Sequence, residues 1–338
     1  MKIAVFEAEE REAKAFERIK SPHLVSLVKE PLSAGNAAKF AGAEIVSTFI
    51  YSKLDRDVLA RLPALKLIAT RSTGYDHIDA GYCRARGILI ANVPVYGENT
   101  VAEHVFALLL AISHRLPEAI ERARSGRFSP EGLQGLDLAG KTMGVIGTGN
   151  IGRHVVRIAK GFSMDVVAHD IHPDAQLPAA LGFRYLDFGE LLKTSDVISL
   201  HVPAAARTQN LLSAAEFDLM KKGVIVINTA RGNLIDSHAL IMALRSGKVA
   251  GAGLDVLPDE PLIREEAELI CSIYEGRHDL RDLVAGHILL HMPNVIVTPH
   301  SAFNTREAVQ RIVDTTVGNI EAYLGGHPRN VAGEALRP

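Results

Sequence analysis

A glycine-rich segment near the middle of the chain has the residue types and the spacing that bind a dinucleotide. It reads Gly147-Thr148-Gly149-Asn150-Ile151-Gly152, follows the apolar run 143–146 and precedes the helical pattern 153–160. The first glycine permits a sharp turn, the second lets the backbone approach a pyrophosphate, and the third lets the helix pack closely on the strand. Because N–H groups at a helix start attract phosphates, the segment predicts a dinucleotide site.

A carboxylate lies near the offset expected for the ribose of that dinucleotide. The strand predicted at 166–169 ends in Asp170, which can accept hydrogen bonds from both ribose hydroxyls. The following Ile171-His172-Pro173 contains no Arg that could receive a 2′-phosphate. We therefore expect NAD as the cofactor. The alternative is a glycine turn of some other α/β protein with an ordinary solvated Asp.

Polar residues that could do chemistry lie at the ends of later apolar runs or a few residues after them. They are Arg231, Asp255, Glu260 and His300. In a doubly wound parallel sheet, ligands bind outside the carboxyl ends of the strands, so these side chains are predicted on one rim. Taken alone, Arg231 is more often a surface charge, Glu260 a solvated loop acid and His300 a helix cap than a catalytic residue.

The elements that must position these residues appear as two groups of short apolar runs that alternate with helical segments. The runs are 2–6, 44–49, 65–70 and 88–90 in the first group, and 143–146, 166–169, 196–200, 224–227, 251–256 and 295–298 in the second. This rhythm is typical of parallel sheets with right-handed crossovers. We predict an α/β fold of two Rossmann-like, doubly wound parallel-sheet domains with a cleft between them.

Two long helical patterns connect the predicted domains. One runs from Thr100 to Leu116, and the other covers 301–323. The second suggests that the chain returns to its first domain. The predicted domains are therefore 1–99 plus 302–338, and 100–301 as the NAD-binding Rossmann domain.

The composition argues against several classes of protein. Of the 338 residues, 47% are hydrophobic and 22% are charged, and the formal net charge is -2, as is ordinary for a globular protein. No basic run is present, and the longest apolar run, 105–112, is too short to span a bilayer. Cys83 and Cys271 have no metal or redox spacing, which suits a reducing compartment. We expect a cytoplasmic protein without nucleic-acid or membrane partners.

The segments after the predicted strands, together with 71–76 and 96–104, resemble the D-2-hydroxyacid dehydrogenase family. The match runs in order across most of the chain. Within the family, the insertion 270–294, Tyr96 and the segment 300–308 are most similar to the D-lactate dehydrogenase branch. The resemblance implies that 1–99 plus 302–338 form a flavodoxin-like substrate (catalytic) domain.

The resemblance also implies a catalytic trio of Arg231, Glu260 and His300. A guanidinium can pair with a carboxylate and polarise the C2 oxygen, an imidazole can give or take the proton, and a carboxylate can orient that imidazole. No metal is expected, because Arg and imidazolium supply the electrophile. Cofactor contacts are expected from the glycine segment, Asp170, Val101, Val202, Pro203, Thr229, Ala230, Arg231 and Asp255. Substrate contacts are expected from Ser72, Thr73, Gly74, Tyr96, Arg231, His300 and Phe303.

The expected activity is that of an NAD-dependent oxidoreductase that interconverts a small 2-oxo acid, with pyruvate favoured, and the D-2-hydroxy acid, here D-lactate. Pro299 and Ser301 stand where Gly and Gln are typical of the D-lactate branch. Glyoxylate, hydroxypyruvate, a branched 2-oxo acid or a phosphoglycerate-type substrate are therefore alternatives. A different class is a non-catalytic NAD-sensing protein like the C-terminal-binding corepressors. The apolar helix from Thr100 and the resemblance both favour a homodimer.

Other residues have a simpler interpretation. His287 and His291 have the i, i+4 spacing of zinc ligands, but no HExxH pattern accompanies them, so we interpret them as structural. His104 lies within the long helix and is interpreted as a hydrogen-bonded polar residue. Tyr96 and Phe303 could be core aromatics instead of substrate contacts.

Overall fold

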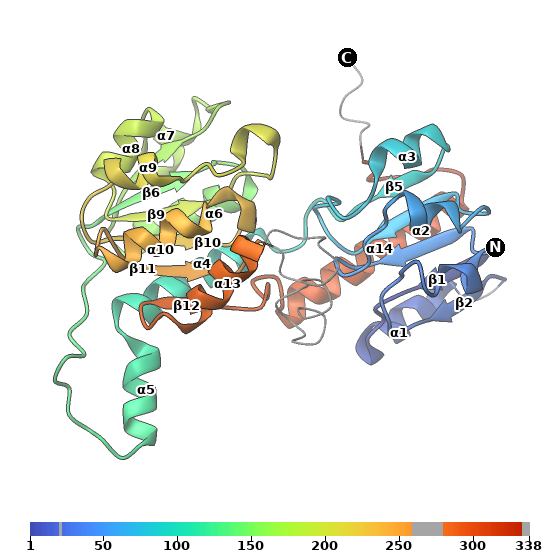
Figure 1. Ribbon diagram of the computed structural model, residues 1–338. Helices are drawn as coiled ribbons and strands as arrows, with labels where there is room; N and C mark the ends of the chain where they lie inside the picture. The colour runs from blue at the N-terminus through green and yellow to red at the C-terminus, as the bar shows by residue number, and fades with distance from the viewer. Residues whose placement is uncertain (20–21, 259–279, 333–338) are drawn as a thin grey trace. The chain divides into compact units, whose positions relative to one another are not determined.

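Two parallel β-sheets, each with helices of its own, organise the chain. The computed structural model describes residues 1–19, 22–258 and 280–332. Contacts divide the chain into two units, Met1–Gly97 with Thr305–Pro338, and Glu98–Asn304. Within the described residues, the first unit has a five-stranded sheet and the second a seven-stranded one (Figure 1). The predicted α/β fold with two parallel sheets is confirmed.

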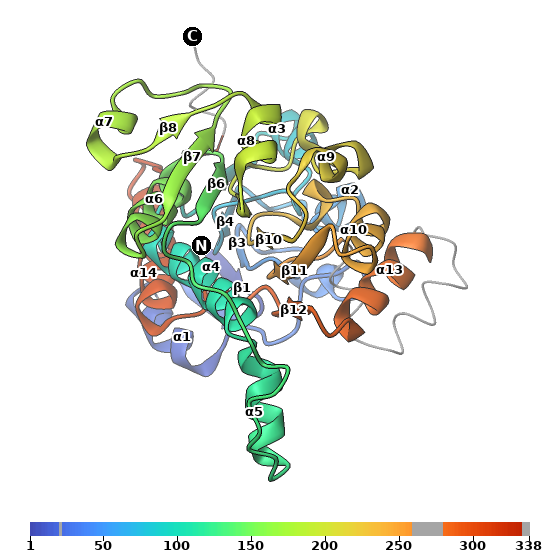
Figure 2. The ribbon, with the colours of Figure 1, turned by 90° about the vertical axis from the view of Figure 1, so that its left-hand side faces the viewer.

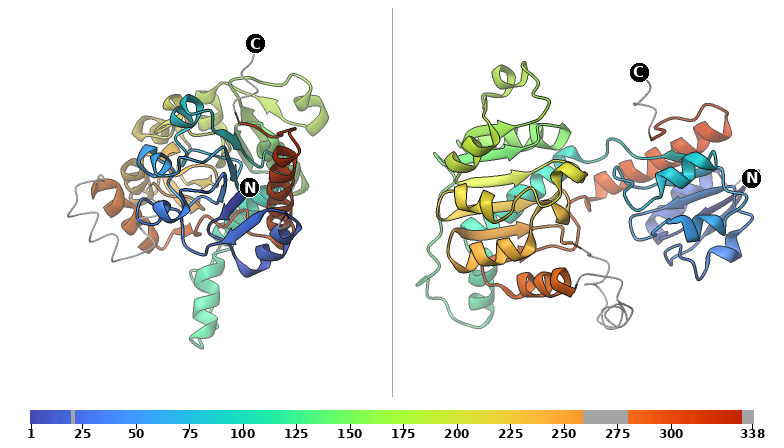
Figure 3. Two further views of the ribbon diagram at one scale, coloured as in Figure 1. Left: turned by 90° about the vertical axis from the view of Figure 1, so that its right-hand side faces the viewer. Right: turned by 45° about the horizontal axis from the view of Figure 1, so that its top comes forward.

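The sheet of the first unit has the order β2-β1-β3-β4-β5. Its strands are β1 (Lys2–Val5), β2 (Leu24–Leu27), β3 (Ile45–Thr48), β4 (Leu67–Thr70) and β5 (Leu89–Ala91). Its helices are α1 (Glu10–Phe16), α2 (Arg56–Ala60), α3 (Ala80–Ala85) and α14 (Arg306–Leu324), with short 3-10 turns η1 (Glu17–Ile19) and η2 (Ala37–Phe40). Although α14 is distant in sequence, it packs against α1 and β4 (Figure 3).

The sheet of the second unit has the order β12-β11-β10-β9-β6-β7-β8. Its strands are β6 (Thr142–Ile146), β7 (Asp165–His169), β8 (Arg184–Tyr185), β9 (Val197–Leu200), β10 (Val224–Asn228), β11 (Val249–Leu254) and β12 (Val295–Val297). Its helices are α4 (Glu98–Ser113), α5 (Leu116–Arg124), α6 (Asn150–Gly161), α7 (Leu177–Leu181), α8 (Phe188–Thr194), α9 (Ala214–Leu219), α10 (Ser237–Arg245) and α13 (Leu280–His291), with turns η3 (Ala206–Thr208) and η4 (Gly232–Leu234).

Helices cover both faces of this second sheet. One core contains residues of α4 and α6, and the other contains residues of α8, α9, α10 and α13. Every residue of β10 is buried, as expected for a parallel strand covered on both sides. Gly253 lets α4 lie close, because a Cβ there would stand 2.9 Å from the Cβ of Leu108.

The long helices differ from the sequence prediction by one or two residues at one end and by more at the other. The first ends at Ser113, because Arg115 has a left-handed φ of 50°, and Leu116 begins the separate helix α5. The second begins at Arg306 and not at Ser301, with the Thr305 side chain accepting the Ala308 N–H at 3.2 Å. The stretch before it is therefore free to form a turn around His300.

Two short strands were not predicted, and both are at sheet edges. β2 has exposed Leu24 and Leu27 and no clear alternation, and β8 has only two residues.

Cys83 is buried in the first unit, and burial raises the pKa of its thiol to about 11. Cys271 lies outside the described residues. Among the described helices, none is both long and apolar enough to cross a membrane.

Candidate active site

The carboxyl ends of three neighbouring strands bring Arg231, Asp255 and His300 to one edge of the second sheet. Parallel pairing aligns Asn228 of β10 with Leu254 of β11, and Leu254 with Val297 of β12. The chain leaves each strand at that edge. The segment that carries Asp255 therefore lies between the segments that carry Arg231 and His300. The structure therefore brings together the loops predicted to share a rim.

The Arg231 segment is held by its own strand and by the loop after β11. The buried Asn228 side chain accepts the Ala230 N–H at 3.0 Å and donates to the Arg231 carbonyl at 2.8 Å. A Cβ on Gly232 would stand 2.2 Å from the Leu257 carbonyl carbon, so only glycine permits this approach of the two loops. The guanidinium is partly exposed, and its Nη1 donates to the Ala230 carbonyl at 2.7 Å.

Asp255 fastens the turn that carries His300. Its buried carboxylate accepts the Ser301 N–H at 2.8 Å, the Ala302 N–H at 2.9 Å and the Thr298 hydroxyl at 2.5 Å. The Asp255 carbonyl accepts the His300 N–H at 2.9 Å. His300 itself has a left-handed φ of 50°, which is uncommon for a residue with a Cβ. The hydrogen bonds on both sides hold that conformation.

His104 completes this network from α4. Its Nε2 lies 3.0 Å from the Thr298 hydroxyl and 3.4 Å from the Asp255 carboxylate. The expected hydrogen-bonded polar role is confirmed. His104 and Thr298 are 194 residues apart in sequence, so no local pattern could have identified their contact.

The network determines how Asp255 responds to pH. Burial raises the pKa of this carboxyl, but hydrogen bonds from His104, Thr298, Ala302 and Ser301 outweigh that effect and lower the pKa below its ordinary 3.8. A carboxyl with a lowered pKa stabilises the fold fully above its ordinary pKa, and this contribution disappears as the pH falls through the lowered value. At neutral pH the turn is therefore held by an ionised carboxylate.

We expect Asp255→Asn to lower the free energy of unfolding at pH 7 by about 2–3 kcal/mol, because an amide NH2 would face a buried N–H donor. Urea unfolding from pH 7 downwards should show the difference from the wild type shrinking below the ordinary carboxyl pKa of 3.8. The control is Asp236→Asn, which retains an acceptor for the Ala239 N–H at the start of α10. A difference that stays constant on acidification would argue against the charged network.

The glycine segment forms the strand, turn and helix start that its sequence predicted. Gly147 has φ 97°, and a Cβ there would stand 2.5 Å from the His201 carbonyl oxygen. A Cβ on Gly152 would stand 2.0 Å from the Gly147 carbonyl oxygen. Gly149, in contrast, faces open space and caps α6 without a side chain. The N–H groups at the start of α6 are therefore accessible to an anion.

Asp170 lies beside this helix start and has protein donors that the sequence did not reveal. Its carboxylate accepts the Thr148 N–H at 2.7 Å, the Thr148 hydroxyl at 2.9 Å and the His172 N–H at 2.9 Å. The Tyr185 hydroxyl is 2.8 Å from that of Thr148. Partial burial raises the pKa of Asp170, but these hydrogen bonds bring it below its ordinary value, so the group is an anion at neutral pH.

The residues present fit a dinucleotide. The glycine turn and the start of α6, where the N-cap Gly149 has no side chain to bind the N–H groups, suit a pyrophosphate. Asp170 suits a ribose. Thr229, at the end of β10, has a buried hydroxyl without a hydrogen-bond partner among the described residues. Val202 is close to the turn, since a Cβ on Gly147 would stand 2.9 Å from its Cγ1. Of the other predicted contacts, Val101 is buried in α4, Pro203 is exposed and Ala230 is partly exposed.

We expect kcat/KM for NADH to exceed that for NADPH by about 100-fold, because a 2′-phosphate would meet the Asp170 carboxylate at short range. Asp170→Ala should reduce this preference mainly by weakening NADH binding. Initial rates with both cofactors test the expectation, and Asp165→Ala, which removes an exposed carboxylate at the other end of β7, is the control. Equal efficiency of the wild type with the two cofactors would mean that Asp170 does not contact the ribose.

His201 also follows a strand, but it is unsuited to proton transfer near neutral pH. Its Nε2 is 2.7 Å from the Ser199 hydroxyl. Burial lowers the pKa of the ring to about 3. Its imidazole therefore remains neutral, and its carbonyl shapes the turn at Gly147.

In the first unit, side chains of the loop after β4 bind backbone carbonyls, while two backbone N–H groups of the loop stay available to a ligand. The Ser72 hydroxyl donates to the Gly74 carbonyl at 2.6 Å, and the Thr73 hydroxyl donates to the Val93 carbonyl at 2.7 Å. The N–H groups of Thr73 and Gly74 donate to no acceptor among the described residues. Tyr96, in the same unit, is partly exposed, and its carbonyl accepts from Arg311 Nε.

The remaining predicted residues are Glu260 and Phe303. Glu260 lies outside the described residues, as do residues 270–279 of the insertion 270–294. Phe303 is partly exposed in the turn after His300. His287 and His291 are both on α13, where the His291 Nδ1 lies 2.8 Å from the His287 carbonyl. Within the described residues, no group of three or more His, Cys, Asp or Glu side chains could hold a metal ion.

Comparisons with known proteins agree with this arrangement. The family model for D-isomer specific 2-hydroxyacid dehydrogenase, NAD binding domain, matches residues 106–302. D-lactate dehydrogenase of Escherichia coli is 37% identical over 95% of this chain and 96% of its own. Glyoxylate reductase of Thermococcus litoralis is 33% identical over 96% of this chain and 95% of its own. The crystal structure of D-lactate dehydrogenase from Aquifex aeolicus with NAD and lactic acid has a TM-score of 0.85 and 35% identity, and 96% of each chain is covered.

The dinucleotide-binding unit and these relatives define an NAD-dependent oxidoreductase of 2-hydroxy acids. The chain belongs to the D-2-hydroxyacid dehydrogenase family. NAD is its cofactor, and its substrate is a small organic acid.

Proposed function

We propose that the protein reduces pyruvate to D-lactate with NADH and catalyses the reverse oxidation. The observation that carries the proposal is the shared anchoring of the Arg231 and His300 loops on the end of β11, through Gly232 on one side and Asp255 on the other. The reduction of a 2-oxo acid requires a group that donates hydrogen bonds to the substrate oxygens and a group that donates a proton. Support for pyruvate comes from the relatives named D-lactate dehydrogenase.

In this proposal each residue has a distinct task. NADH, when bound, supplies the hydride to C2 of the substrate. Arg231 pairs with the substrate carboxylate and polarises the C2 oxygen, while the N–H groups of Thr73 and Gly74 bind the same carboxylate. His300 gives its proton to the C2 oxygen, which becomes the hydroxyl, and takes the proton back in the oxidation.

Other residues complete the proposed site. Glu260 orients and stabilises the His300 imidazolium, as the family resemblance implies. Ser72 supports the loop that binds the carboxylate. Tyr96 and Phe303 contact the small side chain of the substrate. The proposed cofactor contacts are those of Gly147, Gly149, Asn150, Ile151, Gly152, Asp170, Val101, Val202, Pro203, Thr229, Ala230, Arg231 and Asp255.

The test is NADH consumption with a panel of pyruvate, glyoxylate, hydroxypyruvate and a branched 2-oxo acid, with the chirality of each product measured by chiral chromatography. We expect the highest kcat/KM with pyruvate and a D product. A higher value with glyoxylate would favour the activity named for the Thermococcus litoralis relative. NADH binding without consumption of any 2-oxo acid would instead favour an NAD-sensing binding protein.

We also infer that the chain acts as a homodimer through α5 and the loop after it. α5 buries none of its residues and extends away from the sheet of its unit (Figure 2). Leu116 and Ile120 lie one turn apart on it and are 43% and 48% exposed, and Phe128 in the following loop is 84% exposed. A second copy of this chain would cover these apolar side chains.

We expect light scattering after size exclusion to give twice the mass of one chain for the wild type, and Ile120→Asp to weaken the dimer. The matched control is Leu219→Asp, which changes a similarly exposed side chain at the end of α9. A monomeric wild type, or equal behaviour of the two variants, would contradict a dimer through α5.

A further inference from the structure

We propose that Arg71 is a positioning residue for substrate binding, because its buried guanidinium holds the start of the loop Ser72-Thr73-Gly74, here called the carboxylate loop. The inference rests on the proposed function, in which this loop binds the substrate carboxylate. Arg71 immediately precedes the loop at the end of β4, and it is only 1% exposed. It would touch neither substrate nor cofactor.

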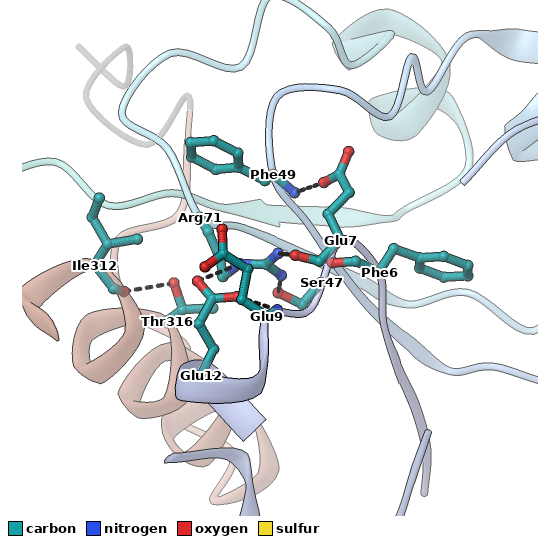
Figure 4. A network of polar contacts seen from close by, with 9 residues as sticks. All are labelled: Phe6, Glu7, Glu9, Glu12, Ser47, Phe49, Arg71, Ile312 and Thr316. Atoms are coloured by element: carbon teal, nitrogen blue, oxygen red, sulfur yellow. Dashed lines mark hydrogen bonds and ion pairs between the residues drawn. The ribbon is translucent and has the colours of Figure 1, made fainter. Parts of the chain in front are cut away.

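The guanidinium binds groups from three other elements of the first unit (Figure 4). It donates to the carbonyls of Phe6 at 2.8 Å and Glu7 at 2.9 Å, which follow β1, and to the Ser47 hydroxyl of β3 at 3.2 Å. Its Nε lies 3.7 Å from the carboxylate of Glu12, in the first turn of α1. Arg71 therefore joins the ends of β1, β3 and β4 and the start of α1.

These contacts are concentrated at the edge from which the carboxylate loop leaves the sheet. The Arg71 N–H also donates to the Thr48 carbonyl at 2.8 Å, so both its backbone and its side chain are fixed by β3. Glu7, whose carbonyl Arg71 binds, has a left-handed φ of 55°. Its carboxylate accepts hydrogen bonds from the Phe49 N–H and the Ser52 hydroxyl. A buried cation is costly unless it is well paired, and here its partners are the segments that surround the loop.

The carboxylate loop has little freedom to compensate for a shift at Arg71. At its start, the hydroxyls of Thr70 and Ser72 are 2.7 Å apart. At its far side, the Asn92 amide donates to the Thr73 carbonyl at 2.8 Å, and the Val93 N–H donates to the Ser72 carbonyl at 3.0 Å. These two hydrogen bonds hold the same peptide groups that carry the open N–H groups of Thr73 and Gly74. A shift of Arg71 moves the start of the loop relative to Asn92 and Val93, so it strains these hydrogen bonds and changes the direction of both N–H groups.

The experiment compares Arg71→Lys with Arg86→Lys. Lysine retains the charge but cannot reproduce the planar fork that reaches two carbonyls and a hydroxyl together. Arg86 is a matched control, because it also donates to two carbonyls of the first unit, those of Leu59 at 3.4 Å and Pro63 at 3.2 Å, from the end of α3. Both variants are measured for thermal stability, NADH affinity, KM and kcat with pyruvate, and binding of oxamate, an unreactive analogue of pyruvate.

We expect Arg71→Lys to raise KM for pyruvate and the dissociation constant of oxamate by roughly 10-fold or more, since small misplacements of binding groups are expensive. NADH affinity should be unchanged, and amide hydrogen exchange should accelerate at 72–74. Arg86→Lys should lose stability without these effects. Ser47→Ala, which removes one acceptor of the guanidinium, should change KM in the same direction and provides the test if Arg71→Lys does not fold.

Two other results would overturn the inference in distinguishable ways. If the wild type reduces pyruvate but Arg71→Lys and Ser47→Ala leave KM and oxamate binding as they are in Arg86→Lys, Arg71 is only structural and the proposed function stands. If the wild type consumes NADH with no 2-oxo acid and does not bind oxamate, the proposed function itself is wrong, and the role of Arg71 is wrong with it.

Discussion

Replacing His300 with Gln is expected to lower kcat/KM for the 2-oxo acid by roughly 10²- to 10⁴-fold, the range typical for loss of a general acid. Gln can still donate a hydrogen bond to the C2 oxygen, but it cannot transfer a proton to it. The turn should survive, because Asp255 binds the backbone N–H groups of Ser301 and Ala302 and not the imidazole. Steady-state rates in both directions and fluorescence titration with NADH provide the measurement.

The matched control for this variant is His238→Gln, an exposed histidine on α10. It should retain wild-type rates. Near-normal activity of His300→Gln would show that another group transfers the proton. A parallel loss of NADH binding would instead mean that His300 supports the cofactor site.

The second large effect is expected from Arg231→Lys, which retains the positive charge. The ammonium cannot form two parallel hydrogen bonds, so both the orientation of the substrate and the polarisation of its C2 oxygen suffer. We expect kcat to fall by about 10²- to 10³-fold, as when one donor to a developing oxyanion is removed. NADH affinity should change far less.

Arg245→Lys is the control, because it makes the same change at an exposed position at the end of α10. Its kinetics should match those of the wild type. If Arg231→Lys loses NADH affinity and catalytic rate to the same degree, Arg231 contacts the cofactor more than the substrate. An unaffected kcat with a raised KM would assign it a binding role without transition-state stabilisation.

Part of this molecule was predictable because it depends on local patterns. The rhythm of buried runs predicted the two parallel sheets, since strands covered on both faces are apolar throughout, as in β10. The glycine segment predicted a strand, a turn and a helix because the positive φ of Gly147 and the close packing of Gly152 on the Gly147 carbonyl lie within six residues. Parallel strands end at one edge, so the shared rim of Arg231 and His300 could also be predicted.

The errors in the predicted helix ends and strands also have local causes. The break after Ser113 was signalled by Pro117, which favours the first turn of a new helix, but the apolar spacing through Leu116 suggested a continuous one. The start of α14 was predicted too early, because the apolar pattern does not reveal that Asp255 holds residues 301 and 302 in a turn. β2 escaped prediction because an exposed edge strand has no buried face to give it a periodicity.

The sequence by itself determined the fold class and the cofactor, because each is encoded by residue types at short spacing. The candidate reacting groups Arg231, Glu260 and His300 are far apart in the chain, and they stay predictions that the family resemblance implied. Only the tertiary structure decided what holds those groups in place. Asp255 meets His104 and the His300 turn because β11 lies between β10 and β12 and α4 packs on that sheet. Arg71 meets Phe6 and Ser47 because β1, β3 and β4 end side by side. Such pairings depend on which strands are neighbours, and strand order is a property of the whole sheet that no short segment contains.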